Sequence, residues 1–207
     1  MRGKFITFEG CDGSGKTTCS KGVYEKLLEE GYDVIYTREP GGIDIAEQIR
    51  KVILDPNNKT MDDRCEALLY AASRRQHLVE KVLPALEAGK IVICDRFIDS
   101  SLAYQGCGRH LGIENVLKIN EFAIEGNMPD VTIFLDVRSE VGLKRLEVRN
   151  YKDRLEQETM QFHKDTSEGY QKVREMFKDR IKVVDANNDA ETVIADAMKI
   201  VKEVINA

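Results

Sequence analysis

The stretch from Phe5 to Thr18 constrains this chain more than any other. A short apolar run ends at Glu9, the spacing G-x-x-x-x-G-K-T begins at Gly10, and an amphipathic segment follows. This spacing, set between a strand and a helix, forms a loop that binds the phosphates of a nucleotide. The glycines permit the tight curl that points backbone N–H groups inward, and the positive end of the helix dipole adds attraction. The predicted phosphate-binding residues are Gly10, Cys11, Asp12, Gly13, Ser14, Gly15, Lys16, Thr17 and Thr18.

Two side chains of this loop have expected chemical roles. The Lys16 ammonium should reach the β- and γ-phosphates of a bound nucleotide, and the Thr17 hydroxyl should ligate Mg²⁺. The alternative is a chance glycine-rich turn, which the strand before the loop and the helix after it disfavour.

Composition and charge exclude several classes of protein. With 207 residues, 32% charged and 42% hydrophobic, the chain is expected to form a single soluble domain over 1–207. The net charge of −5 without a basic arm makes a nucleic-acid partner unexpected, and no apolar run approaches membrane-spanning length. No signal peptide precedes the first strand, and the five cysteines lack C-x-x-C spacing, which fits a reduced cytoplasmic protein.

Strand and helix patterns alternate along the chain. The strand-like runs are 5–9, 33–37, 91–94, 131–135 and 181–184, and the helical patterns are 16–30, 45–54, 62–88, 99–106, 113–125, 139–148, 158–177 and 192–205. Five buried strands separated by helices predict a three-layer α/β fold of the P-loop NTPase type, a parallel sheet with helices on both faces. The glycine-rich residues 106–109 should separate two helices, and the charged residues 149–157 should form a lid. On the long helix, the expected core positions are Leu69, Ala72, Val79, Leu83 and Leu86.

Polar residues follow the predicted strands at the edge where open α/β sheets bind ligands. Asp95 and Arg96 end one buried strand, where a carboxylate suits a metal-bound water and a guanidinium suits a phosphate. Asp136 and Asp185 end other strands, so strand-end position alone does not single out Asp95.

Tyr70, Ser73 and Arg74 share one face of the long predicted helix. Such a face could stack a nucleotide base and hydrogen-bond its edge. On periodicity alone, a solvated helix surface is an equal alternative.

Taken together, the motifs resemble those of the thymidylate kinase family. The matching stretches are 10–17, 38–42 (REPGG), 71–75 (AASRR) and 95–106 (DRFIDSSLAYQG). The similarity runs in order from about Phe5 to Asp165, and the last stretch is the most specific. The resemblance implies a cytoplasmic homodimer that uses ATP and Mg²⁺ to convert dTMP to dTDP, in the synthesis of dTTP for DNA replication.

The resemblance also implies roles around the acceptor phosphate and sugar. Asp12 would bind the 3′-hydroxyl of dTMP, and Glu39 would lie near the sugar and the metal. Arg50 and Arg96 would hold the acceptor phosphate, while Asp95 would serve Mg²⁺ through a water.

A further set of residues would surround the base. Tyr70 would stack on thymine, and Arg74 would hydrogen-bond its edge with Ser73 beside it. The residues that would close over the sugar and base are Ser100, Tyr104 and Gln105.

The resemblance implies that the catalytic cations are Lys16, Arg96 and an arginine of the lid. The phosphate loop has no basic residue except Lys16, which resembles the bacterial type in which the lid supplies the missing charge. Arg149 or Arg154, with Arg149 favoured, should contact the transferring phosphoryl group. From the residues alone, the alternative is a solvated loop whose arginines pair with acidic neighbours.

Other functions fit less well. A GTPase switch should carry N-K-x-D after a strand, and Asn58–Met61 fails at the last position. A nucleotide-binding module without chemistry has no need of a second arginine set at Arg50 and Arg96. Another nucleoside monophosphate kinase is disfavoured by the stretch 95–106.

Overall fold

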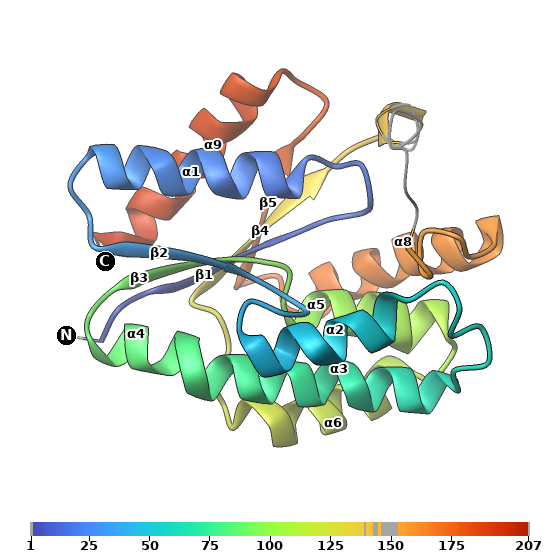
Figure 1. The fold of residues 1–207 in the computed structure, drawn as a ribbon. Helices are drawn as coiled ribbons and strands as arrows, with labels where there is room; N and C mark the ends of the chain where they lie inside the picture. Colours follow the sequence, from blue (N-terminus) through green and yellow to red (C-terminus); the bar gives the residue numbers. More distant parts are fainter. Residues whose placement is uncertain (1, 139, 143–144, 146–152, 207) are drawn as a thin grey trace.

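A five-stranded parallel sheet forms the centre of the molecule (Figure 1). The computed structural model describes residues 2–138, 140–142, 145 and 153–206. The strand order is β2-β3-β1-β4-β5, so β1 lies in the middle and the phosphate loop leaves the centre of the sheet. The strands are β1 (Phe5–Glu9), β2 (Val34–Arg38), β3 (Ile91–Asp95), β4 (Val131–Asp136) and β5 (Ile181–Asp185). The predicted fold class is confirmed.

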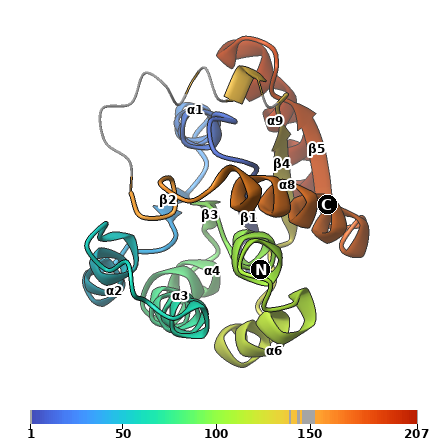
Figure 2. The ribbon, with the colours of Figure 1, turned by 90° about the vertical axis from the view of Figure 1, so that its right-hand side faces the viewer.

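Helices cover both faces of this sheet (Figure 2). One layer holds α1 (Lys16–Glu29) and α9 (Ala190–Ile205). The helices of the other layer are α2 (Asp44–Leu54), α3 (Asp63–His77), α4 (Leu83–Glu87), α5 (Ile98–Ser101), α6 (Ile113–Ile124) and α8 (Met160–Met176). In the described part of the chain, no helix has both the length and the apolar character that crossing a bilayer requires.

Alternating strand residues supply the two hydrophobic cores. Ile6 and Ile93 pack with the apolar side chains of α1 and α9, whereas Phe5, Val92 and Cys94 pack with the helices of the other layer. Residues of the central strands are therefore buried against one helical layer or the other, as expected for a sheet covered on both sides. The two edge strands differ: Ile35 and Tyr36 of β2 are half-buried, and Lys182 and Val183 of β5 are exposed, so the expectation that these strands are fully buried was wrong.

The long helix begins as predicted but buries a different face. Asp62 caps it, accepting hydrogen bonds from the backbone N–H groups of two residues of the first turn. Helical structure continues from α3 through a π-helical segment, Leu78–Val82, into α4. Ala72 and Val79, expected in the core, are exposed. Leu86 is buried as expected. On α3, however, the buried face includes Glu66, Arg74 and His77, whose partners lie inside the protein, and hydrophobic periodicity cannot detect such positions.

The two helices expected on either side of residues 106–109 are separated, but the break begins only at Arg109. A π-helical segment, Leu102–Gly108, continues α5 through these glycines, and the chain turns only after it. A Cβ at Gly108 would lie 2.6 Å from Thr166 Oγ1 and 2.8 Å from a ring carbon of Phe162. The glycine therefore serves the close approach of α8 rather than a turn.

The lid region is described only in part. Glu140, Val141, Gly142 and Arg145 of the predicted helix 139–148 are helical, and its other residues lie outside the described ones. Residues 149–152 of the predicted lid also lie outside, whereas residues 154–157 form turns before α8.

Candidate active site

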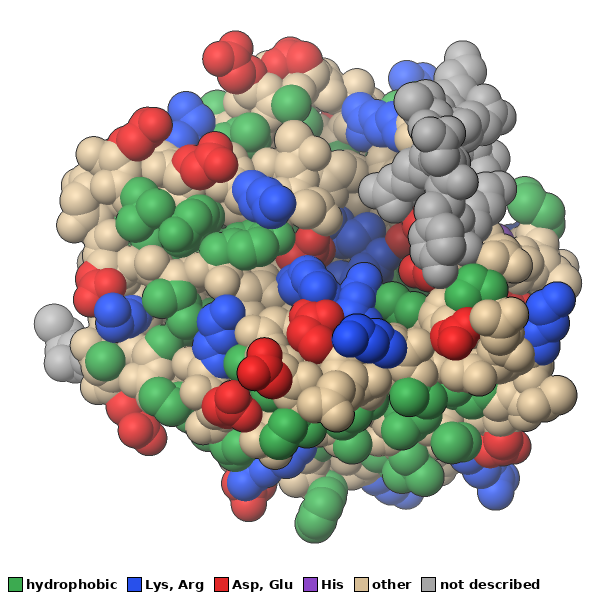
Figure 3. All heavy atoms as spheres, in the orientation of Figure 1, with side chains coloured by type: hydrophobic (Ala, Val, Ile, Leu, Met, Phe, Trp, Pro, Cys, Tyr) green, Lys and Arg blue, Asp and Glu red, His purple; other side chains and the backbone are tan. Residues whose placement is uncertain are grey.

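A cavity of about 250 Å³ opens at the carboxyl ends of the central strands. Lys and Arg side chains gather in and around this hollow (Figure 3). The predicted site residues that line it are Asp12, Gly13, Gly15, Lys16, Thr17, Thr18, Glu39, Arg50, Tyr70, Arg74, Asp95, Arg96, Ser100, Tyr104 and Gln105. Segments far apart in the sequence thus meet at the sheet edge predicted for the ligand site.

The phosphate loop curls around the Lys16 ammonium. Its Nζ donates to the backbone oxygens of Gly10 at 2.9 Å and Cys11 at 2.8 Å. Gly13 has a φ of 79°, and a Cβ there would lie 2.3 Å from the backbone oxygen of Gly142. Burial and the nearby Arg96 charge lower the pKa of Lys16 to about 8, although Asp12 opposes the shift.

Thr17 and Asp95 form the part of the site that suits a metal ion. The Thr17 hydroxyl donates to Asp95 Oδ2 at 2.5 Å, at the start of α1 and the end of β3. Across the described ranges, no group of three or more His, Cys, Asp or Glu side chains could hold a metal. Mg²⁺ commonly uses only one or two protein oxygens together with substrate phosphates, so this pair fits such an ion.

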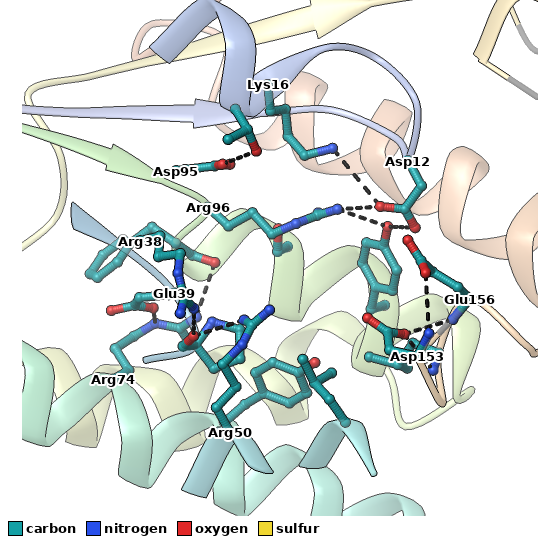
Figure 4. Close-up of a pocket in the computed structure, with 18 of the residues that line it drawn as sticks. Asp12, Lys16, Arg38, Glu39, Arg50, Arg74, Asp95, Arg96, Asp153 and Glu156 are labelled. Atoms are coloured by element: carbon teal, nitrogen blue, oxygen red, sulfur yellow. Dashed lines mark hydrogen bonds and ion pairs between the residues drawn. The ribbon is translucent and has the colours of Figure 1, made fainter. Parts of the chain in front are cut away.

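Arg96 and Asp12 lie together in the cavity (Figure 4). The Arg96 guanidinium donates to Asp12 Oδ1, and the Tyr104 hydroxyl donates to Asp12 Oδ2 at 2.7 Å. Burial alone would raise the pKa of Asp12. The charges of Arg96 and Lys16, with the Tyr104 hydrogen bond, outweigh burial and lower the pKa to about 2.

Glu9 and Tyr170 support this centre, and the sequence reasoning missed both. Buried Glu9 accepts hydrogen bonds from Ser100 Oγ at 2.6 Å and Tyr170 Oη at 2.9 Å. The Tyr170 hydroxyl, from α8, also accepts from Arg96 Nη1 at 3.2 Å. Burial and the charge of Asp99 raise the pKa of Glu9 to about 6. A charged residue ending an otherwise apolar strand was the available signal for Glu9, whereas nothing in the sequence marked Tyr170.

The α3 wall of the cavity carries Tyr70 and Arg74 one turn apart. Arg74 is 2% exposed and donates to Glu39 Oε2 at 2.8 Å and to the backbone oxygen of Phe97 at 3.0 Å. It also donates to Ser101 and Asn120. The structure does not bring Ser73 to the cavity: this residue is buried, and its hydroxyl has no partner among the described residues.

The wall after β2 positions Glu39 and Arg50. Glu39 is held between Arg74 and His77, whose Nδ1 lies 2.9 Å from Glu39 Oε1. Arg50, from α2, donates to the backbone oxygen of Pro40 at 2.9 Å. Both side chains are thereby directed to the cavity that they line.

Of the two lid arginines, only Arg154 lies among the described residues. Arg149 lies outside the described residues. Arg154 is buried and does not line the cavity; it donates to Glu66 and, at 2.8 Å, to the backbone oxygen of Ile53. The alternative of a solvated arginine is therefore wrong for Arg154. In this structure its guanidinium is also held away from the phosphate loop.

Comparison with known proteins identifies the family. The family model for thymidylate kinase matches residues 8–197. A thymidylate kinase of Bacillus velezensis is 56% identical, covering 99% of this chain and 98% of its own, and one of Oceanobacillus iheyensis is 54% identical, covering 100% and 92%. The crystal structure of thymidylate kinase from Ehrlichia chaffeensis has a TM-score of 0.80 at 33% identity, covering 98% of this chain and 99% of that one. The chain therefore belongs to the thymidylate kinase family, whose members use ATP to convert dTMP to dTDP.

Proposed function

We propose that the phosphoryl transfer from ATP to dTMP takes place in this cavity, in a single kinase domain. The observation that carries the proposal is that one cavity joins the phosphate loop to a second set of arginines, including Arg50 and Arg96. A nucleotide switch needs one anion site, whereas a kinase for a nucleotide acceptor needs two. ATP would place its phosphates on the loop, and dTMP would lie between Arg96 and α3.

The chemistry needs charge placement more than proton transfer. The acceptor phosphate has a second pKa of about 6, so it is nearly a dianion at neutral pH and requires no general base. The barrier comes from bringing two anionic groups together in line. Lys16 and Arg96 supply fixed positive charge, and Asp12 with Tyr104 holds the Arg96 guanidinium in the cavity.

Mg²⁺ is the metal that this donor set suits. Thr17 would ligate the ion directly and Asp95 through a water. The two oxygens can serve the same ion because they are within hydrogen-bond distance of each other. When bound, the ion neutralises charge on the β- and γ-phosphates of ATP.

The remaining wall of the cavity would recognise the base and sugar. Tyr70 offers an aromatic plate. Arg74 donates four of its five N–H groups inside the protein, which leaves one Nη2 hydrogen for a base edge. Asp12 and Glu39 would face the sugar, and the residues that would enclose sugar and base are Ser100, Tyr104 and Gln105. A lid arginine, Arg149 in preference to Arg154, would complete the charge on the transferring group.

We also propose that the protein is a cytoplasmic homodimer that serves dTTP synthesis. Apolar side chains on neighbouring helices support the dimer: Leu68 and Val79 are 56% and 38% exposed, and Phe122 on α6 is 87% exposed. A second copy could cover them. Sedimentation should find a dimer, and replacing Leu68 and Phe122 together by Lys should give a monomer.

A coupled assay for ADP release tests the proposed function. Release should depend on dTMP, and Lys16→Met should abolish it while the folded structure persists. Lys199→Ala is the matched control, because Lys199 pairs with Asp196 at the surface of α9 and does not line the cavity. Normal turnover in Lys16→Met would remove the phosphate loop from the mechanism.

A further inference from the structure

Glu66, on α3, is a buried carboxylate that the reaction itself does not use. It accepts hydrogen bonds from three side chains that belong to two other segments. Gln105 Nε2 lies 2.9 Å from Oε1, and Arg109 Nη2 lies 3.0 Å from Oε2. Arg154, from the segment before α8, reaches Oε2 at 2.5 Å. Two guanidinium groups pair with this carboxylate, which is 0% exposed, so the buried charge does not lack a partner.

The Glu66 carboxylate, with both arginines paired to it, fixes which way the Gln105 amide points. A carboxylate can only accept hydrogen bonds, so the amide must turn its NH₂ group toward Glu66. Its oxygen, Oε1, then faces away. No described group donates a hydrogen bond to this oxygen. The oxygen is nevertheless not completely buried. Gln105 is only 1% exposed and lines the acceptor cavity, so the small exposed part of its side chain, which includes Oε1, faces that cavity.

We propose that Glu66 is a positioning residue for base selection, which holds the Gln105 amide so that Oε1 faces the acceptor base as a hydrogen-bond acceptor. Thymine and uracil carry an N–H at ring position 3 and can donate to this oxygen. Cytosine has a lone pair at that position, so its edge would oppose the Gln105 oxygen. The inference rests on the proposed placement of dTMP against Gln105 and adds the residue that sets the orientation of the amide.

The other partners of Glu66 provide a matched control. Arg109 also pairs with Glu158 at 2.6 Å, and within the described part of the chain Glu158 makes no hydrogen bond to Gln105. Removing the Glu158 charge therefore disturbs the same arginine without freeing the amide. An effect on base selection that is specific to Glu66 must pass through Gln105.

The test compares Glu66→Gln with Glu158→Gln, using dTMP, dUMP and dCMP as acceptors. An amide at position 66 can donate as well as accept, so Gln105 is free to turn over. The ratio of kcat/KM for dTMP to that for dCMP should fall by about tenfold or more, since a mismatched buried polar group is the main source of such discrimination. The KM for dTMP should rise, the KM for ATP should stay unchanged, and the ratio of dTMP to dUMP should hold because both carry the N–H. Glu158→Gln should shift the dTMP to dCMP ratio by less than about twofold.

A rescue variant covers the case in which Glu66→Gln does not fold. The double variant E66Q/Q105E exchanges the carboxylate and the amide and keeps the charge of the cluster. The carboxylate at position 105 can only accept, so the preference for dTMP over dCMP should be that of the unmodified protein. Loss of the preference in the double variant, or its full retention in folded Glu66→Gln, overturns the proposal.

Gln105→Met separates this inference from the proposed function. If this variant keeps the full preference for dTMP over dCMP, the base does not lie against Gln105, and the placement of dTMP fails together with the inference. If Gln105→Met narrows the preference but Glu66→Gln does not, the placement stands and only the role of Glu66 is overturned.

Discussion

The Asp12 carboxylate and the Arg96 guanidinium form an ion pair that joins the phosphate loop to the end of β3. Arg96 has a φ of 72°, a backbone conformation that residues with a side chain rarely adopt. The guanidinium also contacts the hydroxyls of Ser100 and Tyr170. A cation held by so many groups is in place before the acceptor arrives, which reduces the cost of ordering the site.

This pair should make the protein sensitive to acid. The pKa of Asp12 is about 2 in the folded protein against 3.8 ordinarily, so its stabilising effect is complete above pH 3.8 and is lost as the pH falls toward 2. Urea unfolding at several pH values should show a steeper decline in the free energy of unfolding for the unmodified protein than for Asp12→Asn. The difference in decline should be about 2 kcal/mol. If the free energy of unfolding declined equally in the two proteins, the pKa of Asp12 would not change on folding.

Nucleotide binding should take up protons at Lys16. Because the pKa of Lys16 is about 8, its amine is partly neutral at mildly alkaline pH when no nucleotide is bound. Bound phosphates favour the charged ammonium form. Calorimetry of ATP binding at pH 8 to 8.5, in buffers of different ionisation enthalpy, should therefore find an uptake of about half a proton or more. The uptake should be smaller at pH 6.5, where the ammonium is already charged. Equal heats in all buffers at pH 8.5 would contradict the shift.

Tyr70 should contribute to base binding without affecting ATP. If the ring stacks on thymine, Tyr70→Ala should weaken dTMP binding by about 1–3 kcal/mol, the range for base–aromatic stacking. The affinity for ATP, measured on the same preparation, is the internal control. Equal losses for the two nucleotides would instead indicate that α3 had been destabilised.

Much of the fold followed from local sequence patterns. The strand-length apolar runs predicted the parallel sheet, and the glycine-rich loop predicted the position of the site. Both patterns can be recognised from residues that are adjacent in the sequence. The face of α3 could not be predicted in this way. Its buried positions include Glu66, Arg74 and His77, whose partners come from distant segments.

The site could be predicted where a residue type and a strand end coincide, as at Asp95 and Arg96. It could not be predicted where a side chain reaches the centre from another layer, as Tyr170 does from α8. Arg154 shows the limit most clearly. Because Arg154 lies in a charged stretch, its side chain was expected either to be solvated or to contact a phosphate. In the fold it instead pairs with the buried carboxylate of Glu66.

Replacing Arg149 should mainly affect turnover, whereas replacing Arg154 should mainly affect stability. Arg149→Ala should lower turnover by about 10³-fold while the affinities for ATP and dTMP change little, as expected for a cation on the transferring phosphoryl group. Arg154→Ala should lower the free energy of unfolding, because a buried partner of Glu66 is removed. Steady-state kinetics, calorimetry and urea unfolding of both variants provide the measurements. Near-normal turnover in both would mean that the missing charge comes from elsewhere.

The central claim is that the cavity beside Arg96 receives the phosphate of the acceptor, and calorimetric titration with dTMP and thymidine tests it most directly. Thymidine has the same base and sugar, so the ratio of the two affinities isolates the phosphate. In Arg96→Ala the preference for dTMP should fall by about 10- to 100-fold, the loss expected for charge-assisted hydrogen bonds, while thymidine binding is retained. Lys199→Ala, which removes a cation paired with Asp196 at the surface of α9, should keep the preference. An undiminished preference for dTMP in Arg96→Ala would contradict the assignment of this cavity to the acceptor phosphate.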